Sequence, residues 1–330
     1  MKLSLPVEIV GMGAAMPENV VTNADFEARL DTTDAWIVQR TGIRERRWTA
    51  AGESTLSLAV QASREALADA GLAAEDIDLI IVATITPEHT LPSTACELQA
   101  ALGCRWIPVY DLVAACSGFV YAFTQGAQNV CNGLAGNALI VGAEAMTRLF
   151  DPDDRGTAIL FGDAAAAVVI RRSEDPDRGI VAARLGADGS RARTIYIPAG
   201  GAALPASNNT VNEKLHFVRM EGRDVYKFAV NQMCAIVQET LDDVGMSVDR
   251  LKLLVPHQSN LRIIESAVKR IGIDPAKVVM NIDRYGNTSA ASVPVALYEA
   301  RRDGRYGPGD DVMMVAFGAG LTWGSALMRM

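Results

Sequence analysis

The chain has 330 residues, of which 49% are hydrophobic and 21% charged, and its formal net charge is −8 with a sequence pI near 5.1. These values exclude a disordered chain, and the length suits two domains better than one compact core. The acidic balance argues against sequence-independent nucleic-acid binding. The longest apolar stretches (79–86 and 164–170) have the length of strands rather than of membrane spans, and no secretory signal precedes them, so we expect a cytoplasmic protein.

The first elements in chain order belong to an internal repeat. Residues 66–82 (ALADAGLAAEDIDLIIV) resemble residues 240–256 (TLDDVGMSVDRLKLLVP), with Gly71 opposite Gly245, and both segments predict a helix, a glycine stop, a charged connection and a buried strand. The same spacing along the chain, called here the repeat spacing, relates the strand-like segments 138–142 and 312–316. Because two separate pairs share one spacing, the chain is predicted to consist of two similar halves.

Each half alternates apolar strands with helical stretches, which predicts an α/β fold with mostly parallel, mixed sheets. The strands are nearly continuous apolar runs, as expected when helices cover both faces of a sheet. The charged segment 173–178 contains a proline and predicts a boundary between a half at 1–175 and a half at 176–330. Residues 198–212 are predicted to form an exposed loop.

The candidate nucleophile is Cys116, in the stretch 111–119 (DLVAACSGF), where an extended segment precedes a helix predicted from Gly118 to about Val130. A thiol at the start of a helix lies at the positive end of the helix dipole, which favours the thiolate. Most single cysteines are buried structural residues, and the other four cysteines of the chain fit that interpretation better. The five cysteines contain no CxxC pair, so we expect neither a disulfide framework nor a metal site.

Histidine is scarce, and one of the three histidines follows a predicted strand. His257 comes directly after the apolar segment 253–256 and precedes a helix predicted to begin near Leu261. In open α/β sheets, ligands bind beyond the carboxyl ends of the strands, which is the position of His257. A structural role remains the alternative for His257 taken alone, and His89 and His216 lie in ordinary polar, loop-like contexts.

The third candidate is Asn287, in a run of small residues at 285–292 (YGNTSAAS). The repeat spacing places position 290 opposite Cys116, so the two loops are equivalent and are expected to approach one shared site. An asparagine here could also serve as a turn or helix-capping residue. The glycine-rich segment 316–324 could supply an oxyanion-hole amide or form a plain hairpin turn. Catalysis therefore requires the coincidence of all three side chains.

Stretches along the whole chain resemble those of one enzyme family. They are 31–47 (DTTDAWIVQRTGIRERR), 111–119 (DLVAACSGF), 151–157 (DPDDRGT), 255–264 (VPHQSNLRII), 285–294 (YGNTSAASVP) and 317–327 (FGAGLTWGSAL). The family is that of the β-ketoacyl-acyl-carrier-protein synthases III, the initiating condensing enzymes of fatty-acid synthesis. The resemblance implies a thiolase-like fold with a layered αβαβα core, and a homodimer.

The resemblance also implies roles for individual residues. Cys116 takes an acyl group from acyl-CoA, and His257 and Asn287 bind the malonyl thioester of malonyl-acyl carrier protein and promote its decarboxylation. The backbone amides of Cys116 and Ala319 form the oxyanion hole. The remaining residues implied by the resemblance are those that bind CoA (Thr32, Trp36, Arg40, Arg155 and Gly156), line the acyl pocket (Leu91, Met146 and Phe161) and dock the acidic carrier protein (Lys227, Arg262, Lys269 and Arg270).

Elementary chemistry agrees with these roles. Loss of CO2 from a malonyl thioester builds negative charge on the thioester oxygen, and two neutral donors, an imidazole and a carboxamide, can stabilise it. Covalent storage of the acyl group on a cysteine divides the reaction into two steps, so ping-pong kinetics are expected. The chemistry requires no metal or other cofactor. Leu91 and Ala319 depart from the residues of some relatives, and Leu91 leaves the length of the acyl primer open.

Other functions share parts of this pattern. A papain-like hydrolase has the same order of Cys, His and Asn, but its cysteine stands in a CG[SA]C[WY] context, which is absent here. A related condensing enzyme that makes a specialised metabolite would carry the same site residues. A non-catalytic acyl-CoA-binding protein is the third alternative. The charge pattern of the proposed docking face is equally that of a solvated helix.

Overall fold

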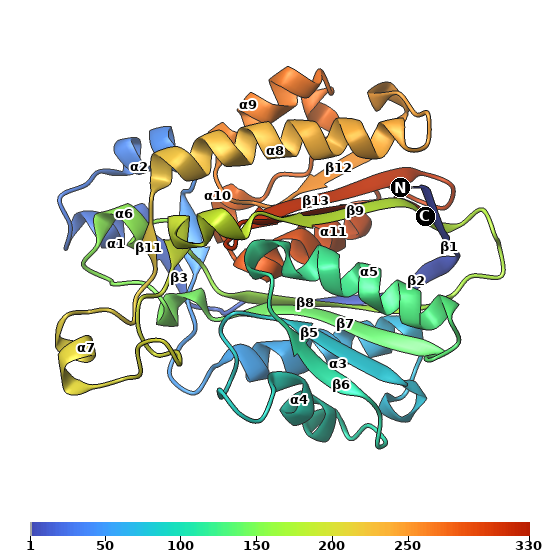
Figure 1. Cartoon of the computed structure of the whole chain (residues 1–330), viewed down its shortest axis with the longest axis horizontal. Coiled ribbons are helices and arrows are strands. Elements are labelled where there is room, and N and C mark those ends of the chain that lie inside the picture. Colours follow the sequence, from blue (N-terminus) through green and yellow to red (C-terminus); the bar gives the residue numbers. More distant parts are fainter. Residues whose placement is uncertain (1) are drawn as a thin grey trace.

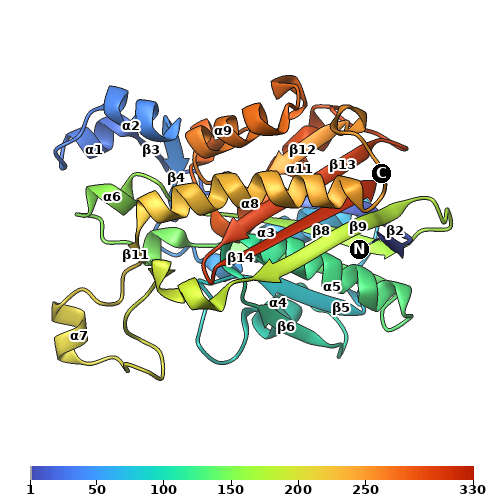
Figure 2. The same cartoon turned by 45° about the horizontal axis from the view of Figure 1, so that its top comes forward.

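The computed structural model describes residues 2–330, and two five-stranded sheets dominate it (Figures 1 and 2). The first sheet has the order β2-β8-β7-β5-β6, formed by Val7–Ala15, Ala164–Arg172, Asn137–Glu144, Leu79–Ala83 and Val109–Leu112. The second has the order β1-β9-β14-β13-β12, formed by Lys2–Leu5, Gly179–Ala187, Thr322–Arg329, Asp311–Gly318 and Leu253–Pro256.

Helices fill three layers around and between these sheets. Helices α5 (Gly118–Cys131) and α11 (Ser292–Arg302) lie between the sheets, as Figure 1 shows. Helices α3 (Thr55–Ala70) and α4 (Thr94–Leu102) cover the outer face of the first sheet. The outer face of the second sheet is covered by α8 (Gly222–Asp242) and α9 (Leu261–Ile271). The predicted αβαβα layering is therefore confirmed.

The predicted repeat is present in the structure, and its equivalent elements coincide residue by residue. The repeat spacing relates β5 to β12, β7 to β13, and the 3-10 turn η2 (Ala115–Ser117) to η7 (Ser289–Ala291). It also relates the first residues of α5 and α11, which are Gly118 and Ser292. The two central helices therefore begin at equivalent places, each directly after a 3-10 turn.

The predicted predominance of parallel pairing is wrong. Strand β5 is parallel to both β6 and β7, and β12 is parallel to β13, whereas all other neighbouring pairs in the two sheets are antiparallel. Apolar runs report burial of both faces but not strand direction. Each half has a helical crossover between its parallel strands (α5 or α11), whereas β14 returns directly from β13 through a hairpin turn.

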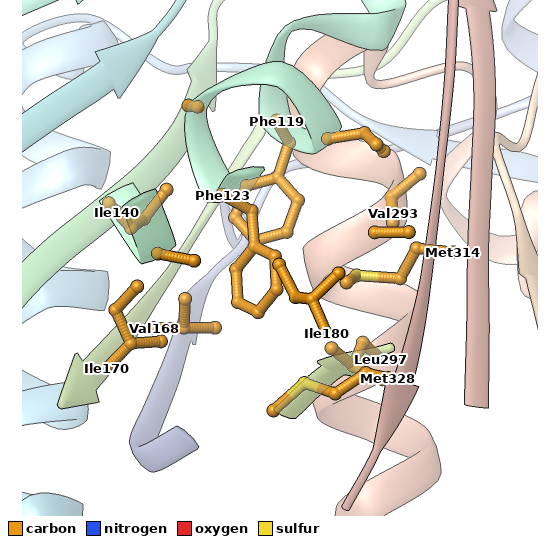
Figure 3. Packing of buried hydrophobic residues seen from close by; sticks show 14 of the residues in the cluster. Phe119, Phe123, Ile140, Val168, Ile170, Ile180, Val293, Leu297, Met314 and Met328 are labelled. Atoms are coloured by element: carbon orange, nitrogen blue, oxygen red, sulfur yellow. The ribbon is translucent and has the colours of Figure 1, made fainter. Parts of the chain in front are cut away.

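The middle layer holds the main hydrophobic core (Figure 3). Phe119 and Phe123 on α5 are fully buried and stack with ring centroids 6.0 Å apart. They lie among aliphatic side chains from the strands on one side and Val293 and Leu297 of α11 on the other. Full burial of such a side chain stabilises the fold by about 1.5–3 kcal/mol, so this core fixes the two helices relative to each other.

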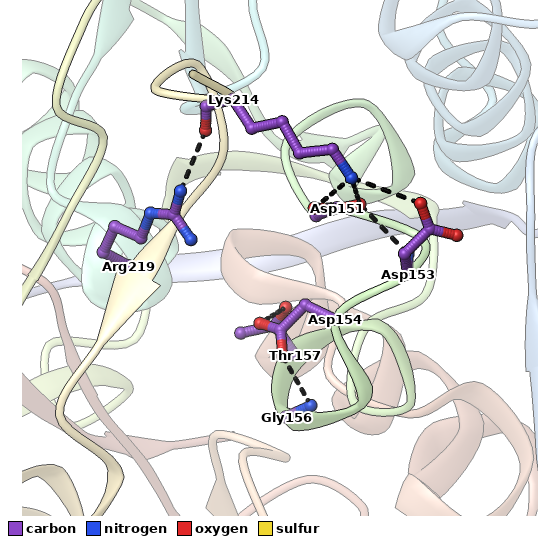
Figure 4. Close-up of polar contacts among 7 residues, drawn as sticks. All are labelled: Asp151, Asp153, Asp154, Gly156, Thr157, Lys214 and Arg219. Atoms are coloured by element: carbon purple, nitrogen blue, oxygen red, sulfur yellow. Dashed lines mark hydrogen bonds and ion pairs between the residues drawn. The ribbon is translucent and has the colours of Figure 1, made fainter. Parts of the chain in front are cut away.

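Smaller elements border the ends of the strands at which α5 and α11 begin. They are β3 (Val20–Thr22), α1 (Asn23–Glu27), α2 (Asp34–Thr41), β4 (Glu45–Arg47), α6 (Arg155–Ala158), β10 (Ile195–Tyr196), α7 (Asn208–Asn212), β11 (Arg219–Met220) and α10 (Ile282–Tyr285). The segment predicted as a loop, 198–212, is exposed over most of its length and ends in the short helix α7. Lys214 follows α7, and its ammonium group binds the carboxylates of Asp151 and Asp153. These contacts link the segment around α7 to the loop before α6 (Figure 4).

The boundary between the predicted halves falls between β8 and β9, in the segment 173–178. Strand β1 is the exception to this division, because residues 2–5 pair with β9 of the second sheet. The division into units 1–175 and 176–330 therefore stays a prediction. Among residues 2–330, no helix combines the length and the apolar composition that a membrane crossing needs.

Candidate active site

Cys116 lies in η2, one residue before Ser117, which is the N-cap residue of α5. The edge strand β6 ends at Leu112, and Ala115 adopts a left-handed conformation (φ 48°) that turns the chain sharply into the helix. The predicted start of this helix at Gly118 is confirmed. The Ser117 hydroxyl bonds to the carbonyl of Ala114 (2.7 Å), which holds the turn. The thiol is thereby presented at the end of the first sheet.

The electrostatic state of Cys116 differs from the sequence-based expectation. Burial raises the pKa of the thiol to about 12; a hydrogen bond with the Ser289 side chain acts in the opposite direction, and the charge of Glu144 adds to the increase. The helix start that was expected to favour a thiolate is present, but burial outweighs it. The resting nucleophile is therefore a thiol, which must lose its proton when it reacts.

His257 directly follows β12, as predicted, and is 1% exposed. Its Nδ1 lies 2.6 Å from the Ser292 hydroxyl, and its ring packs edge-on against Phe317 at 5.6 Å. Burial lowers the pKa of the imidazole to about 3, so the ring is neutral at physiological pH. When the Ser292 hydroxyl donates to Nδ1, the ring carries its proton on Nε2 and presents a neutral donor.

Asn287 is held from both sides by backbone groups. Its N–H donates to the carbonyl of Leu160 (2.8 Å), and its carbonyl accepts from the N–H of Gly162 (3.1 Å). The side-chain oxygen accepts a hydrogen bond from the N–H of Ser289 (2.9 Å). Because this bond uses the carboxamide oxygen, the NH2 group is left to donate elsewhere.

One cavity of about 210 Å³ brings the three predicted side chains together. Cys116, His257 and Asn287 all line it, together with Ala319 from the turn between β13 and β14. Most other lining residues are apolar (among them Ile85, Leu160, Val218, Met220, Phe228 and Ile263). The cavity therefore combines one nucleophile, two neutral donors and walls that suit a hydrocarbon chain.

The glycine-rich turn after β13 packs against the backbone of Cys116. A Cβ on Gly318 would lie 2.7 Å from the Cys116 nitrogen, so only glycine permits this approach. The segment connects β13 and β14 as a hairpin turn, as one of the two sequence interpretations predicts, and Gly318 and Ala319 also line the cavity. Whether the amides of Cys116 and Ala319 act as an oxyanion hole stays a prediction.

Three of the residues predicted to bind CoA lie together, and Asn260, which lines the cavity, donates to the carbonyl of one of them, Arg40 (3.1 Å). The guanidinium carbons of Arg40 and Arg155 lie 5.0 and 4.8 Å from the ring centroid of Trp36. Arg155 begins α6, and its guanidinium also contacts Asp31, the neighbour of Thr32. The N–H of Gly156 donates to Asp154 (2.9 Å; Figure 4). The structure therefore assembles this predicted group, while its binding role stays a prediction.

The predicted acyl-pocket residues divide into two groups. Met146 and Phe161 line the cavity with Cys116. Leu91 does not line it: its side chain is 87% exposed, in the loop between β5 and α4. The loop carries Leu91 to the surface of this chain, so its predicted role in the acyl pocket stays a prediction.

The predicted docking residues lie on two adjacent helices. Lys227 is on α8, and Arg262, Lys269 and Arg270 are on α9, all exposed. Arg270 donates to Asn231 of α8 (2.7 Å), which links the two helices. In the part of the chain that the structure describes, no three His, Cys, Asp or Glu side chains are grouped as metal ligands.

Sequence reasoning missed three polar residues of the site. Ser292 contacts His257, Ser289 contacts Asn287, and Glu144 is buried at the end of β7 with Ser289 as one of its donors. Both serines lie in the quoted run of small residues. The carboxylate could have been noticed because it ends an apolar strand, where the repeat has Gly318.

Comparisons with known proteins agree over the whole chain. The family described as 3-oxoacyl-[acyl-carrier-protein (ACP)] synthase III matches residues 110–189, and its C-terminal part matches residues 241–330. A β-ketoacyl-[acyl-carrier-protein] synthase III of Symbiobacterium thermophilum is 49% identical and aligns over 98% of each chain.

Solved structures show the same likeness. The crystal structure of 3-oxoacyl-[acyl-carrier-protein] synthase III from Aquifex aeolicus superposes with a TM-score of 0.91 at 43% identity, covering 98% of this chain and 100% of that one. The priming β-ketosynthase of the R1128 polyketide biosynthetic pathway superposes with a TM-score of 0.90 at 34% identity, covering 98% and 96%.

The layered fold and a thiol that shares one cavity with two neutral donors define a thiolase-like condensing enzyme of the acyltransferase class. The chain belongs to the 3-oxoacyl-[acyl-carrier-protein] synthase III family. The resemblance found in the sequence and the predicted enzyme class are thereby confirmed. The papain-like alternative is excluded by this membership.

The state of His257 can be tested directly. We expect its ring signals to show no titration between pH 5 and 9, because the folded chain lowers its pKa to about 3. The measurement is a pH series of NMR spectra on 15N-histidine-labelled protein, with the resonance assigned by its loss in His257→Gln. An inflection near pH 6.5, the usual value for histidine, would contradict a neutral donor.

Proposed function

We propose that the chain catalyses the decarboxylative Claisen condensation of an acyl-CoA primer with malonyl-acyl carrier protein. The products are 3-oxoacyl-acyl carrier protein, CoA and CO2, and the reaction initiates fatty-acid synthesis. One observation carries this proposal: Cys116, His257 and Asn287 share a single apolar cavity in a member of this family.

In the first half-reaction the Cys116 sulfur attacks the carbonyl carbon of the acyl-CoA thioester. The bond from that carbon to the CoA sulfur breaks, CoA leaves as a thiol, and the acyl group stays on Cys116. Negative charge develops on the carbonyl oxygen, and we expect the backbone amides of Cys116 and Ala319 to stabilise it. The group of Trp36, Arg40 and Arg155 beside the cavity suits the adenine and phosphates of CoA.

In the second half-reaction the malonyl thioester replaces CoA. Nε2–H of His257 and the NH2 group of Asn287 donate to its thioester oxygen while the carboxylate leaves as CO2. The resulting enolate carbon attacks the acyl carbonyl on Cys116, the bond from that carbon to the Cys116 sulfur breaks, and the released thiolate takes up a proton from solvent to restore the thiol. Two neutral donors suit this step because they stabilise the enolate without pairing with the departing carboxylate. The step needs no metal or other cofactor.

A priming role in a polyketide pathway is the second candidate, because the R1128 priming β-ketosynthase has nearly the same structure. Both functions use the same acylation and decarboxylation chemistry. They differ in the carrier protein that presents the malonyl group, so the preferred carrier protein distinguishes them.

The division of labour among the three side chains is testable by intact-protein mass spectrometry with a panel of acyl-CoAs. Wild-type protein should gain one acyl group on Cys116, and Cys116→Ser should gain none. His257→Ala and Asn287→Ala should still be acylated but should lose decarboxylation by about 10²- to 10³-fold each, the usual effect of removing one oxyanion donor. Absence of any acyl adduct, or normal decarboxylation by both variants, would refute the assignment.

We also propose that the acidic carrier protein docks on the exposed basic side chains of α8 and α9. Lys227, Arg262 and Lys269 are free of side-chain ion pairs in the described part of the chain, while Asn260 at the start of α9 lines the cavity. A partner on this face would therefore reach the cavity with its prosthetic arm. Complementary charge mainly accelerates encounter and is screened by salt.

Charge reversal on α9 tests docking of the carrier protein independently of the acylation of Cys116. Arg262→Glu and Lys269→Glu should raise KM for malonyl-acyl carrier protein roughly tenfold at low salt and leave acylation by acyl-CoA unchanged. The matched control is Arg302→Glu, on α11 at a distance from α9, which should change neither quantity. Unchanged KM in both α9 variants would place the carrier protein elsewhere.

We further propose that the chain forms a homodimer through the β6 edge. Strand β6 has no neighbour on its outer side in the first sheet, as far as residues 2–330 are concerned. Large apolar side chains are exposed around it: Trp106 is 100% exposed, Leu91 87% and Val113 77%. An open strand edge beside exposed apolar surface favours pairing with a second copy.

Sedimentation velocity tests the dimer. The wild-type chain, 35.2 kDa as a monomer, should sediment as a dimer, and Trp106→Glu combined with Val113→Glu should shift it to the monomer. Met280→Glu is the matched control, since Met280 is also exposed but lies near α9. A monomeric wild type, or a double variant that stays dimeric, would refute this interface.

A further inference from the structure

A buried carboxylate lies next to the nucleophile and takes no part in the reaction steps described above. Glu144 is the last residue of β7 and is fully buried. Its oxygens accept hydrogen bonds from the Thr84 hydroxyl (3.2 Å), from the N–H and hydroxyl of Thr86 (3.2 and 2.7 Å), and from the N–H of Ile85 (3.1 Å). The Ser289 hydroxyl donates to it from the other half of the molecule (2.9 Å).

These partners supply hydrogen bonds but no compensating positive charge. No lysine, arginine or histidine is among the hydrogen-bond donors to Glu144 in the part of the chain that the structure describes. A carboxylate removed from water without a cation is costly, and such groups concentrate at functional sites. Burial raises the pKa of Glu144 to about 7, so this group exchanges a proton in the physiological range.

Ser289 connects this carboxylate to both sides of the active site. Its backbone is left-handed (φ 50°), at the position equivalent to Ala115 in the other half. From there its N–H donates to the Asn287 side chain, its hydroxyl donates to Glu144, and it makes the hydrogen bond that lowers the pKa of Cys116. One serine thus contacts the nucleophile, a donor residue and the buried acid.

Other titratable groups near Glu144 have partners of their own. Asp163 precedes β8, the strand that pairs with β7, and its carboxylate binds Thr49 and Thr147. His257 lines the same cavity as Cys116 but directs Nδ1 to Ser292. Cys116 on η2 is the titratable group whose pKa the charge of Glu144 raises. The thiol and the carboxylate therefore form a coupled pair of acids joined by a hydroxyl.

We propose that Glu144 is a positioning residue for the nucleophile and acts through Ser289: its carboxylate orients the Ser289 hydroxyl and takes up, by way of that hydroxyl, the proton that Cys116 loses on attacking the acyl thioester. This inference rests on the proposed function. The Cys116 S–H proton passes to Oγ of Ser289 while the Ser289 proton passes to Oε1 of Glu144. When CoA departs, Glu144 returns a proton to Oγ of Ser289 and the Ser289 hydroxyl gives its own proton to the CoA sulfur, so no further reactant is needed.

The pH dependence of acylation follows from this pathway. Below about pH 7 Glu144 is already protonated and cannot accept the proton, so acylation of Cys116 should rise with pH up to about 7 and then level off. Without this acceptor, the rate depends only on the small fraction of thiolate. It should then climb about tenfold per pH unit across the same range, because the thiol pKa lies near 12.

The test is a pH series of single-turnover acylation of the full-length protein by acetyl-CoA, followed by intact mass. Glu144→Gln should acylate roughly 10²-fold more slowly at pH 7, as expected for loss of general-base assistance, and should lose the plateau above pH 7. Glu299→Gln is the matched control: Glu299 on α11 binds Arg284 and Asn281 and should keep the wild-type profile. A Glu144→Gln profile with the wild-type inflection would overturn the proposal.

A second variant keeps the proposal testable if Glu144→Gln does not fold. Ser289→Ala leaves the carboxylate in place and removes the hydroxyl bridge, so it should lose the plateau as Glu144→Gln does. Ser289→Ala with a wild-type rate and inflection would overturn transfer through Ser289, whatever the stability of the Glu144 variant. Wild-type protein that is never acylated would instead refute the proposed function itself.

Discussion

The active site depends on the close approach of two helix starts between the sheets. Helices α5 and α11 meet where η2 and η7 precede them, and the packing around these turns is tight at two glycines. A Cβ on Gly142 would lie 2.5 Å from the carbonyl oxygen of Ala290, the residue equivalent to Cys116. A Cβ on Gly118 would lie 3.2 Å from the Cβ of Ala83. Because this packing is so tight, the loops that carry Cys116 and Asn287 cannot move apart without disturbing both halves.

The reactive side chains of the site stand at positions where the two halves of the repeat differ in sequence. The repeat spacing pairs Cys116 with Ala290, His257 with Ala83 and Glu144 with Gly318. In each pair one half carries a reactive side chain and the other a small residue. The glycine at 318 approaches the backbone of Cys116, whereas the glutamate at 144 lies beneath the opposite loop. A duplicated scaffold thus supplies one asymmetric site.

The sequence was sufficient to predict the architecture but not the hydrogen bonds that tune the site. The repeat predicted the equivalence of the Cys116 and Asn287 loops, and the position of His257 after a strand predicted its place at the cavity. Strand direction was mispredicted because an apolar run records burial alone. Ser289, Ser292 and Glu144 were missed since their roles depend on side-chain contacts between the halves, which no local pattern encodes. The exposure of Leu91 could not be predicted because the course of a loop follows tertiary packing.

Burial affects the two sides of the cavity in opposite ways. It keeps His257 neutral, which is the form that donates to an enolate without attracting the carboxylate that must leave. The same burial keeps Cys116 protonated, which opposes nucleophilic attack unless a base is at hand. A dry cavity that favours the second half-reaction therefore creates the need for an acceptor in the first. A carboxylate on the Cys116 side, separated from the malonyl group by Ser289, meets that need without placing negative charge where CO2 departs.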